Sequence, residues 1–232
     1  MDIKSTLNEI FKSNKVAIHL DLPFGPPGFF DINKSVVLTW IIMGVFLVFC
    51  LMLTHNLKVH GCSRRQLLAE TIVVKLRALV AGLIGKNGTP YIDWLICVML
   101  YIGLANLMGV FGFTPSTMDL NVTIALAGMS IVLVEAAGIR HRGVGGWMKS
   151  FTKPIWIITP MNILEVGIKP LSLCMRLFGN VLGATVIMEL IKLVVPVFVP
   201  ALLSLYFDFF DGLIQAYVFV FLTSLYIAEA TE

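Results

Sequence analysis

Five stretches of this chain are apolar for long enough to cross a membrane as helices. The first is the most distinct, since no charged side chain interrupts Val36 to Leu53 within residues 36–54. A helix needs about 20 apolar residues to cross the hydrocarbon core of a bilayer. The other stretches cover residues 91–112, 119–138, 155–193 and 199–228. Together they predict an all-α membrane protein with five transmembrane crossings. The last two stretches exceed a simple crossing and are expected to form a long, tilted hairpin.

The composition agrees with a lipid environment and argues against several other classes. Hydrophobic residues make up 58% of the chain and charged residues 13%, whereas a water-soluble domain needs more polar surface. The net charge of +3 is small, and no basic block interleaves with aromatic residues, so we expect no nucleic-acid partner. The four cysteines lack metal-like spacing, and the first 35 residues contain no short apolar segment typical of a signal peptide. We expect neither a metal site nor a cofactor.

Residues 64–86 lie between the first two apolar stretches and show a different pattern. Apolar side chains recur there at helical spacing, with charged side chains between them. The apolar positions are Leu68, Ile72, Leu76, Leu79 and Leu83, and the charged positions are Arg64, Arg65, Glu70, Lys75 and Arg77. We interpret this segment as an amphipathic helix on the membrane surface. A solvated loop with an apolar stripe is the alternative.

The distribution of Lys and Arg predicts how the chain is oriented. Basic residues cluster after the first and third apolar stretches and are missing from the turns near residues 113–118 and 194–200. Because cytoplasmic loops carry an excess of Lys and Arg, both basic segments are expected in the cytoplasm. Residues 1–35 then form an extracytoplasmic segment, residues 36–232 form the polytopic membrane domain, and the C-terminus is cytoplasmic. Four lysines near the N-terminus run against this orientation, although acidic residues accompany them.

Arg176 lies deep within the fourth apolar stretch, among Met175, Leu177 and Phe178. An arginine at the centre of a bilayer costs about 2.5–3.5 kcal/mol on insertion scales, and its guanidinium stays protonated there. The side chain therefore requires water, a carboxylate or a partner protein beside it. A buried salt bridge with a neighbouring helix is the alternative to a functional role.

The polar residues after Arg176 divide between two faces of one helix. Asn180 lies one turn onward, on nearly the same face as the arginine. Thr185 and Glu189 lie on the opposite side, about 180–220° around the helix from Arg176. This helix is therefore predicted to present a cation to one neighbour and an acceptor-rich face to another.

The last apolar stretch carries a polar stripe. Its members are spaced by four, three and four residues and are Ser204, Asp208, Asp211 and Gln215. Tyr226 and Glu229 extend the same face towards the predicted cytoplasmic end. Aspartates in hydrocarbon are costly, so the stripe is expected to line a wet cavity. Alternatively, Asp208 and Asp211 lie near the outer interface and simply meet solvent there.

These polar groups describe an interrupted path for an ion. A polar vestibule stands at the outer end, a fixed cation at mid-depth and a polar patch at the inner end. A continuous pore would dissipate an ion gradient, and a central positive charge repels cations, so a mobile carrier must bridge the gap. Nothing in this chain resembles that carrier, which points to a second subunit.

The run from Lys169 to Asn180 contains Arg-Leu-Phe-Gly-Asn and resembles the motif of the a subunit of F-type ATP synthases. The segments Thr117–Leu126, Asn106–Gly109 and Leu213–Ala216 are similar to further segments of that family. The resemblance covers most of residues 36–228. It implies a non-catalytic, ion-translocating stator subunit in the membrane sector of a rotary ATP synthase. Its partners would be the ring of c subunits, the b subunits of the peripheral stalk and the remaining synthase subunits, in a bacterial plasma membrane.

The resemblance also assigns roles to single residues. Arg176 would be the essential arginine that faces the c ring and separates two half-channels, so that each ring carboxylate releases its ion before passing. Asn180 and Gln215 match the family's polar residues near the arginine. The remaining matches are Asp119 at the outer vestibule and, along the inner half-channel, Glu165, Lys169 and Tyr226.

Two positions depart from the family pattern. A glutamate commonly stands nine residues after the arginine, where this chain has Thr185. A histidine commonly stands seven residues before the glutamine, where this chain has Asp208. We hypothesise that the carboxylate role has moved to Asp208 and Asp211, with Glu189 assisting. The coupling ion is left open between proton and sodium, because the ring carboxylate that selects it belongs to another chain.

Three rival functions fit the sequence less well. A secondary transporter predicts internal repeats with paired broken helices, and the arginine segment has no second copy. An intramembrane enzyme requires a reactive constellation at membrane depth, but the four histidines, His19, His55, His60 and His141, all lie outside the spans. A passive anchor leaves the cost of Arg176 and the two aspartates unexplained.

Overall fold

The computed structural model describes residues 33–54, 64–85, 88–111, 115–150, 159–194 and 198–231. Within these ranges the chain forms helices and turns and no strand, as the sequence predicts. The long helices are α2 (Lys34–Thr54), α3 (Arg64–Ile84), α4 (Ile92–Leu107), α5 (Leu120–Ser150), α6 (Thr159–Val194) and α8 (Gly212–Thr231). The shorter elements are the 3₁₀ turns η1 (Thr89–Tyr91), η2 (Met108–Phe111) and η3 (Ser116–Met118), the helix α7 (Phe198–Ser204) and the π-helical η5 (Leu205–Asp211). Most of the predicted extracytoplasmic segment, residues 1–32, lies outside the described residues.

Five helical segments are long and apolar enough to cross a membrane. They are Lys34–Thr54, Thr89–Val110, Leu120–Met148, Thr159–Lys192 and Leu202–Thr231. Each corresponds to one of the five stretches predicted from hydropathy, and four of them differ from it by only a few residues at either end. The all-α membrane architecture is therefore confirmed in the part of the chain that the structure describes.

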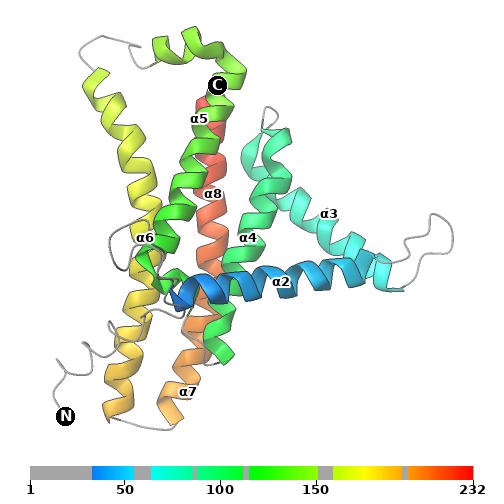
Figure 1. The fold of residues 1–232 in the computed structure, drawn as a ribbon, viewed down its shortest axis with the longest axis vertical. Helices are drawn as coiled ribbons and strands as arrows, with labels where there is room; N and C mark the ends of the chain where they lie inside the picture. The colour runs from blue at the N-terminus through cyan, green and yellow to red at the C-terminus, as the bar shows by residue number, and fades with distance from the viewer. Residues whose placement is uncertain are drawn as a thin grey trace, which may run out of the picture.

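Helix α8 is the centre of the packing. It lies between α4 and α5 in Figure 1, and its buried side chains Phe219, Val220 and Ile227 contribute to two apolar clusters, of which one includes α3 and the other α6. Gly103 of α4 lies close to α8. A Cβ placed at position 103 would stand only 3.8 Å from Leu213 Cδ2. Small residues at such contacts let membrane helices approach closely, where van der Waals packing rather than the hydrophobic effect holds them together.

Helix α2 runs across the direction shared by α5, α6 and α8 (Figure 1). Its contacts with the rest of the protein are sparse, and only 6% of the residues in its most apolar stretch are buried. Most of its surface is therefore free to contact lipid or partner proteins. If α2 crosses the bilayer directly, the long helices α6 and α8 must be steeply tilted. This arrangement agrees with the tilted hairpin predicted from the length of the last two stretches.

Residues 64–84 form a regular helix, so the loop alternative for this segment is wrong. One side of α3 packs on the protein through Val80 and Ile84. Arg77 joins it to the start of α4 by two hydrogen bonds to the Asp93 carboxylate, at 2.8 and 2.7 Å. The rest of α3 is largely exposed, including many of its apolar side chains. Such a helix suits a location at the boundary between lipid and water.

The third predicted stretch was expected to end near residue 138, but α5 continues to Ser150. The predicted end was too early because hydropathy falls at Arg140 and Arg142, whereas the helical backbone continues through them. Gly143 then adopts φ +71° and ψ 162° and turns the helix. After this turn the chain comes back on itself, and the Trp147 indole donates a hydrogen bond of 2.7 Å to the Glu135 carboxylate.

Replacement of Gly143 by Ala is expected to destabilise this turn by about 1–2 kcal/mol, because a side chain at positive φ crowds the backbone. Gly145→Ala is the matched control, since a Cβ meets no atom within 4 Å at either position and only Gly143 has positive φ. Thermal unfolding of the purified subunit in detergent should show a lower midpoint for the Gly143 variant alone. Equal midpoints for the two variants would contradict a strained backbone turn at Gly143.

Candidate functional site

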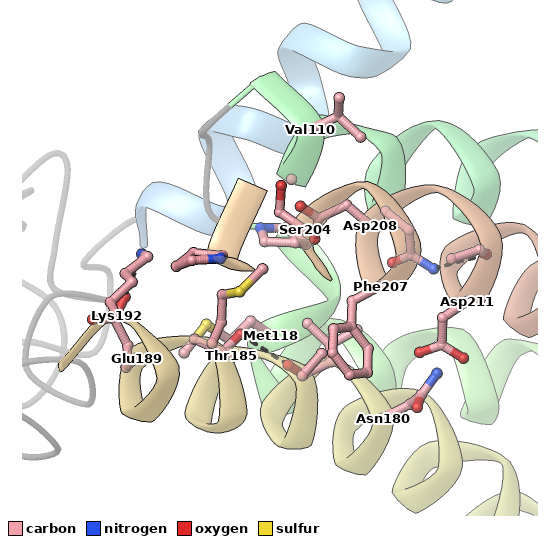
Figure 2. Close-up of a pocket in the computed structure, with 18 residues that line it drawn as sticks. Val110, Met118, Asn180, Thr185, Glu189, Lys192, Ser204, Phe207, Asp208 and Asp211 are labelled. Carbon is pink, nitrogen blue, oxygen red and sulfur yellow. Dashed lines mark hydrogen bonds and ion pairs between the residues drawn. The ribbon is translucent and has the colours of Figure 1, made fainter. Parts of the chain in front are cut away.

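A cavity of about 450 Å³ lies between α6, η5 and the turn from α4 into η2. Figure 2 shows polar side chains entering it from both sides of the α6–α8 hairpin. Those that line it are Asn106, Asn180, Thr185, Glu189, Lys192, Ser204, Asp208 and Asp211. A cavity of this size and polarity has room and partners for several water molecules. The structure therefore brings the predicted residues Asn180, Asp208, Asp211 and Glu189 to one wet site.

The segment that carries both aspartates is a π-helix. Its bonding shows at Gly212, whose N–H donates to the carbonyl of Phe207, five residues earlier. The π-helical turn is rare and is found mostly at functional sites. It interrupts the regular spacing from which the polar stripe was inferred. Asp208 and Asp211 line the cavity, whereas Gln215 lies outside its lining and is buried.

The cavity extends along α6 from Lys192 to Asn180. At one end Lys192 forms an ion pair of 2.8 Å with Glu189. At the other end, Figure 2 shows the carboxylate of Asp211 and the amide of Asn180 pointing towards one another. Arg176 is one helical turn beyond Asn180, so the cavity approaches the arginine without including it.

Arg176 is exposed on the surface of α6. The opposite face of the helix is fixed by Leu173, Cys174 and Leu177, which are buried against α4, α5 and α8. Within the described residues, no carboxylate stands within ion-pair distance of the guanidinium, so a buried salt bridge does not explain it. Its neighbours Leu171 and Met175 are exposed apolar side chains. A fixed cation thus stands on an otherwise apolar surface.

A second polar cluster lies on the other side of Arg176. Lys169 forms an ion pair of 3.0 Å with Glu229 of α8 and one of 3.4 Å with Glu165 of its own helix. Its ammonium also stands 5.1 Å from the centre of the Tyr226 ring, a distance that allows a cation–π interaction. The Lys169 side chain is 17% exposed, whereas both carboxylates are about half exposed. The structure therefore brings Glu165, Lys169 and Tyr226 together with Glu229, which the polar stripe also placed at this end.

Besides Arg176, two predicted residues lie in neither group. Asp119 is buried at the start of α5, where it accepts hydrogen bonds from the Asn121 N–H at 3.0 Å and from the Asn33 amide at 3.2 Å. This is the chemistry of a helix cap, although Met118 beside it lines the cavity. Gln215 is buried, and its Nε2 has no hydrogen-bond partner among the described residues.

The sequence reasoning did not identify two residues that shape the cavity. Asn106 and Gly109 both line it from the α4–η2 turn. A single amide and a glycine in an apolar stretch carry no periodic signal, because a lone polar residue is as typical of a helix contact as of a site. The signal that was present is the similarity of Asn106–Gly109 to a segment of the family.

Comparisons with known proteins identify the family of the chain. The family described as ATP synthase A chain matches residues 36–228, which is most of the chain. The chain belongs to this family. It is 33% identical over 207 residues to the ATP synthase subunit a 2 of Acaryochloris marina, covering 88% of both chains. The subunit a of Moorella thermoacetica is 35% identical, covering 85% of this chain and 90% of its own. The sodium ion specific subunit a of Propionigenium modestum is 32% identical, covering 85% of this chain and 74% of its own.

Membership defines the broad function of the chain. It is an ion-translocating subunit of the membrane sector of an ATP synthase, and therefore part of that complex. The five apolar helices make it a multi-pass protein of a bacterial membrane.

Water access to the cavity can be measured with engineered thiols. In a variant without native cysteines, Thr185→Cys should react readily with a small, charged thiol reagent, because Thr185 lines the cavity. Thr223→Cys is the matched control, since both threonines donate to the carbonyl four residues earlier, but Thr223 is fully buried. Similar rates at the two positions would contradict a wet cavity.

Proposed function

We propose that the chain provides two half-channels, one from each membrane face, which end on either side of Arg176. The observation that supports this most is the position of the arginine. It is exposed and unpaired within the described residues, and it stands between two polar sites that share no residue. Along α6, about 10 Å of helix separates Lys169 from Arg176. An ion therefore needs a carrier to pass from one site to the other.

The cavity around Asp208 and Asp211 is the proposed outer half-channel. These carboxylates, with Glu189 from α6, accept the incoming ion, and Asn180 stands where the ion leaves for the carrier. All three carboxylates line one cavity, which supports this role. Asp119 is proposed to hold the start of α5 beside the entrance, and Gln215 to serve as a polar neighbour of the arginine.

The cluster around Lys169 is the proposed inner half-channel. Glu165 and Glu229 present half-exposed carboxylates on either side of the ammonium. Such groups can receive an ion released beyond the arginine and pass it to water. Tyr226 packs against Lys169 and holds the lysine between the two helices.

The exposed surface of α6 and α8 is the proposed contact for a ring of c subunits. Exposed apolar side chains neighbour Arg176 on α6, including Leu171 and Met175, and Tyr217 of α8 is also exposed. A helix of the ring can pack on them with its carboxylate beside the guanidinium. The positive charge stabilises the ionised carboxylate, so the ion must leave before the site passes. The reloaded, neutral site then moves into lipid.

The chain is proposed to couple a proton or a sodium ion to rotation without catalysing a covalent step. One charge that crosses 100 mV releases about 2.3 kcal/mol. A single crossing cannot drive ATP synthesis, so the energy of several ions must be summed by a rotating carrier. The b subunits of the peripheral stalk are proposed to hold this chain against the rotating ring.

The proposed orientation places residues 1–35 outside the cell, residues 36–232 in the membrane domain and the C-terminus in the cytoplasm. The basic side chains after α2 and near the turn of α5 support it. In this orientation the cavity opens outwards, and the cluster around Lys169 faces the cytoplasm.

Arg176→Ala is expected to abolish ion-driven ATP synthesis, because ring carboxylates could then pass the boundary still loaded. The measurement is ATP synthesis in vesicles that carry the assembled complex, together with passive ion leakage. Arg65→Ala is the control, since it removes another exposed arginine, on α3, that belongs to neither polar site. Normal synthesis in the Arg176 variant would refute the proposed mechanism.

The orientation predicts which terminus a protease can reach. An epitope tag at the C-terminus should be removed from inverted vesicles and protected in right-side-out vesicles, and a tag at the N-terminus should show the reverse. Removal of both tags from the same face would indicate an even number of crossings and contradict the five proposed.

A further inference from the structure

The outer cavity depends on contacts from a helix that carries no charge into it. The α4–η2 turn contributes Asn106, Gly109 and Val110 to the lining. The titratable groups that face the cavity come from elsewhere, with Glu189 and Lys192 on α6 and Asp208 and Asp211 on η5. The turn must therefore act through shape and hydrogen bonds.

Gly109 leaves open the space that the Asp208 side chain occupies. A Cβ at position 109 would lie 2.6 Å from Asp208 Oδ1 and 2.8 Å from its Cγ. Real Cβ atoms essentially never come so close to another heavy atom. Any side chain at position 109 must displace the carboxylate, so the missing side chain on η2 defines where Asp208 stands.

Asn106, one turn before Gly109, joins three segments. Its Nδ2 donates a hydrogen bond of 3.2 Å to the carbonyl of Gly212, and its Oδ1 accepts one of 2.7 Å from Thr117. Asn106 is 4% exposed, and a Cβ at Gly212 would stand 2.8 Å from the Asn106 Cβ. The Asn106 amide is thus held against Gly212, the residue that directly follows the π-helix.

The position of this contact matters because a π-helix and an α-helix place their residues at different angles. A π-helix of seven residues turns on the order of 100° less than an α-helix of the same length. If the segment reverted to α-helical bonding, Ser204 and Asp208 would turn away from the cavity relative to α8. The hydrogen bond to Gly212 ties the junction between the π-helix and α8 to α4, and a displaced Asn106 would leave a buried amide without partners.

We propose that Asn106 and Gly109 are positioning residues of the outer half-channel: Asn106 holds the end of the π-helix, and Gly109 provides the place for the Asp208 carboxylate. This inference rests on the proposed function, in which Asp208 receives the incoming ion. It predicts that the position of the carboxylate matters and that the helix supplying it does not.

The decisive experiment moves the carboxylate from one helix to the other. Gly109→Asp alone should impair ion-driven ATP synthesis, because it crowds Asp208, and Asp208→Gly alone should impair it because the carboxylate is missing. The double variant places a carboxylate at nearly the same point from η2. It should exceed each single variant by about tenfold or more, since small displacements of a reacting group cost up to about a hundredfold.

Rates are normalised to the amount of assembled complex, and Asp208→Ala replaces Asp208→Gly if the glycine prevents assembly. Gly128→Ala is the control for an added methyl group, because a Cβ there meets no atom within 4 Å. A double variant no better than Asp208→Gly would overturn the inference. Full activity of either single variant would also overturn it.

The role of Asn106 is tested by thiol reactivity, which a simple loss of stability would not change per assembled complex. Ser204→Cys, which lines the cavity, should react about tenfold more slowly when Asn106→Leu is added, because the segment turns away. Thr117→Val keeps the bond to Gly212 and should change the rate less. An unchanged rate with Asn106→Leu would overturn this part of the inference.

Arg176→Ala, measured in parallel, separates this inference from the proposed function. Normal synthesis in that variant would refute the half-channel mechanism whatever the carboxylate transfer shows. Loss of synthesis there, combined with failure of the double variant, would leave the half-channels standing and refute the positioning roles alone.

Discussion

Hydrocarbon can neither hydrate a charge nor form a hydrogen bond with a backbone, and this constraint organises the whole chain. Each charged group that the structure describes on the α6–α8 hairpin is paired, stands beside a cavity or lies at a surface. Lys169 is paired with two carboxylates, and the aspartates of η5 share a wet cavity. Arg176 has neither arrangement within the described residues. It is therefore the group whose compensation must come from another molecule.

The packing of α8 determines where the polar side chains of the site stand. Its buried side chains fix it to α4 and α5, so its polar positions are held at defined depths. The π-helical segment then places Asp208 and Asp211 against α6 instead of lipid. At the opposite end, Glu229 connects α8 to Lys169 of α6, and its carbonyl accepts a hydrogen bond from Arg142 of α5. Both ends of the hairpin are thus polar, and the middle presents one cation.

Much of this organisation could be predicted from the sequence, because the hydropathy of a stretch follows directly from the residues it contains. The five spans follow from the lengths of the apolar stretches, and the high cost of a charge in lipid identifies Arg176 without any structure. The family motif then assigns the function. In the Lys169 cluster, Tyr226 and Glu229 followed from the polar stripe, whereas Glu165 and Lys169 were predicted only through that resemblance.

The remaining features depend on backbone geometry that has no simple sequence pattern. A strictly α-helical period grouped Gln215 with Asp208 and Asp211, but Gln215 is buried and lies outside the lining of the cavity that both aspartates line. The continuation of α5 past Arg140 was not predicted, because a helix can continue through polar residues after its apolar stretch has ended. Gly143 and Gly109 show the same difficulty, since the sequence reveals a glycine but not whether it provides a positive φ or room for a neighbour.

The exposed arginine also has a consequence for biogenesis. A newly inserted copy of this subunit, before it meets a partner, presents Arg176 to lipid and carries the penalty of a charge in hydrocarbon. Partner binding removes that penalty, so the free subunit is less stable in the bilayer than the incorporated one. The side chain that we propose to serve in translocation therefore also favours assembly over accumulation of orphan subunits. Membrane proteases that sense exposed polar groups would meet this surface only in copies that have failed to assemble.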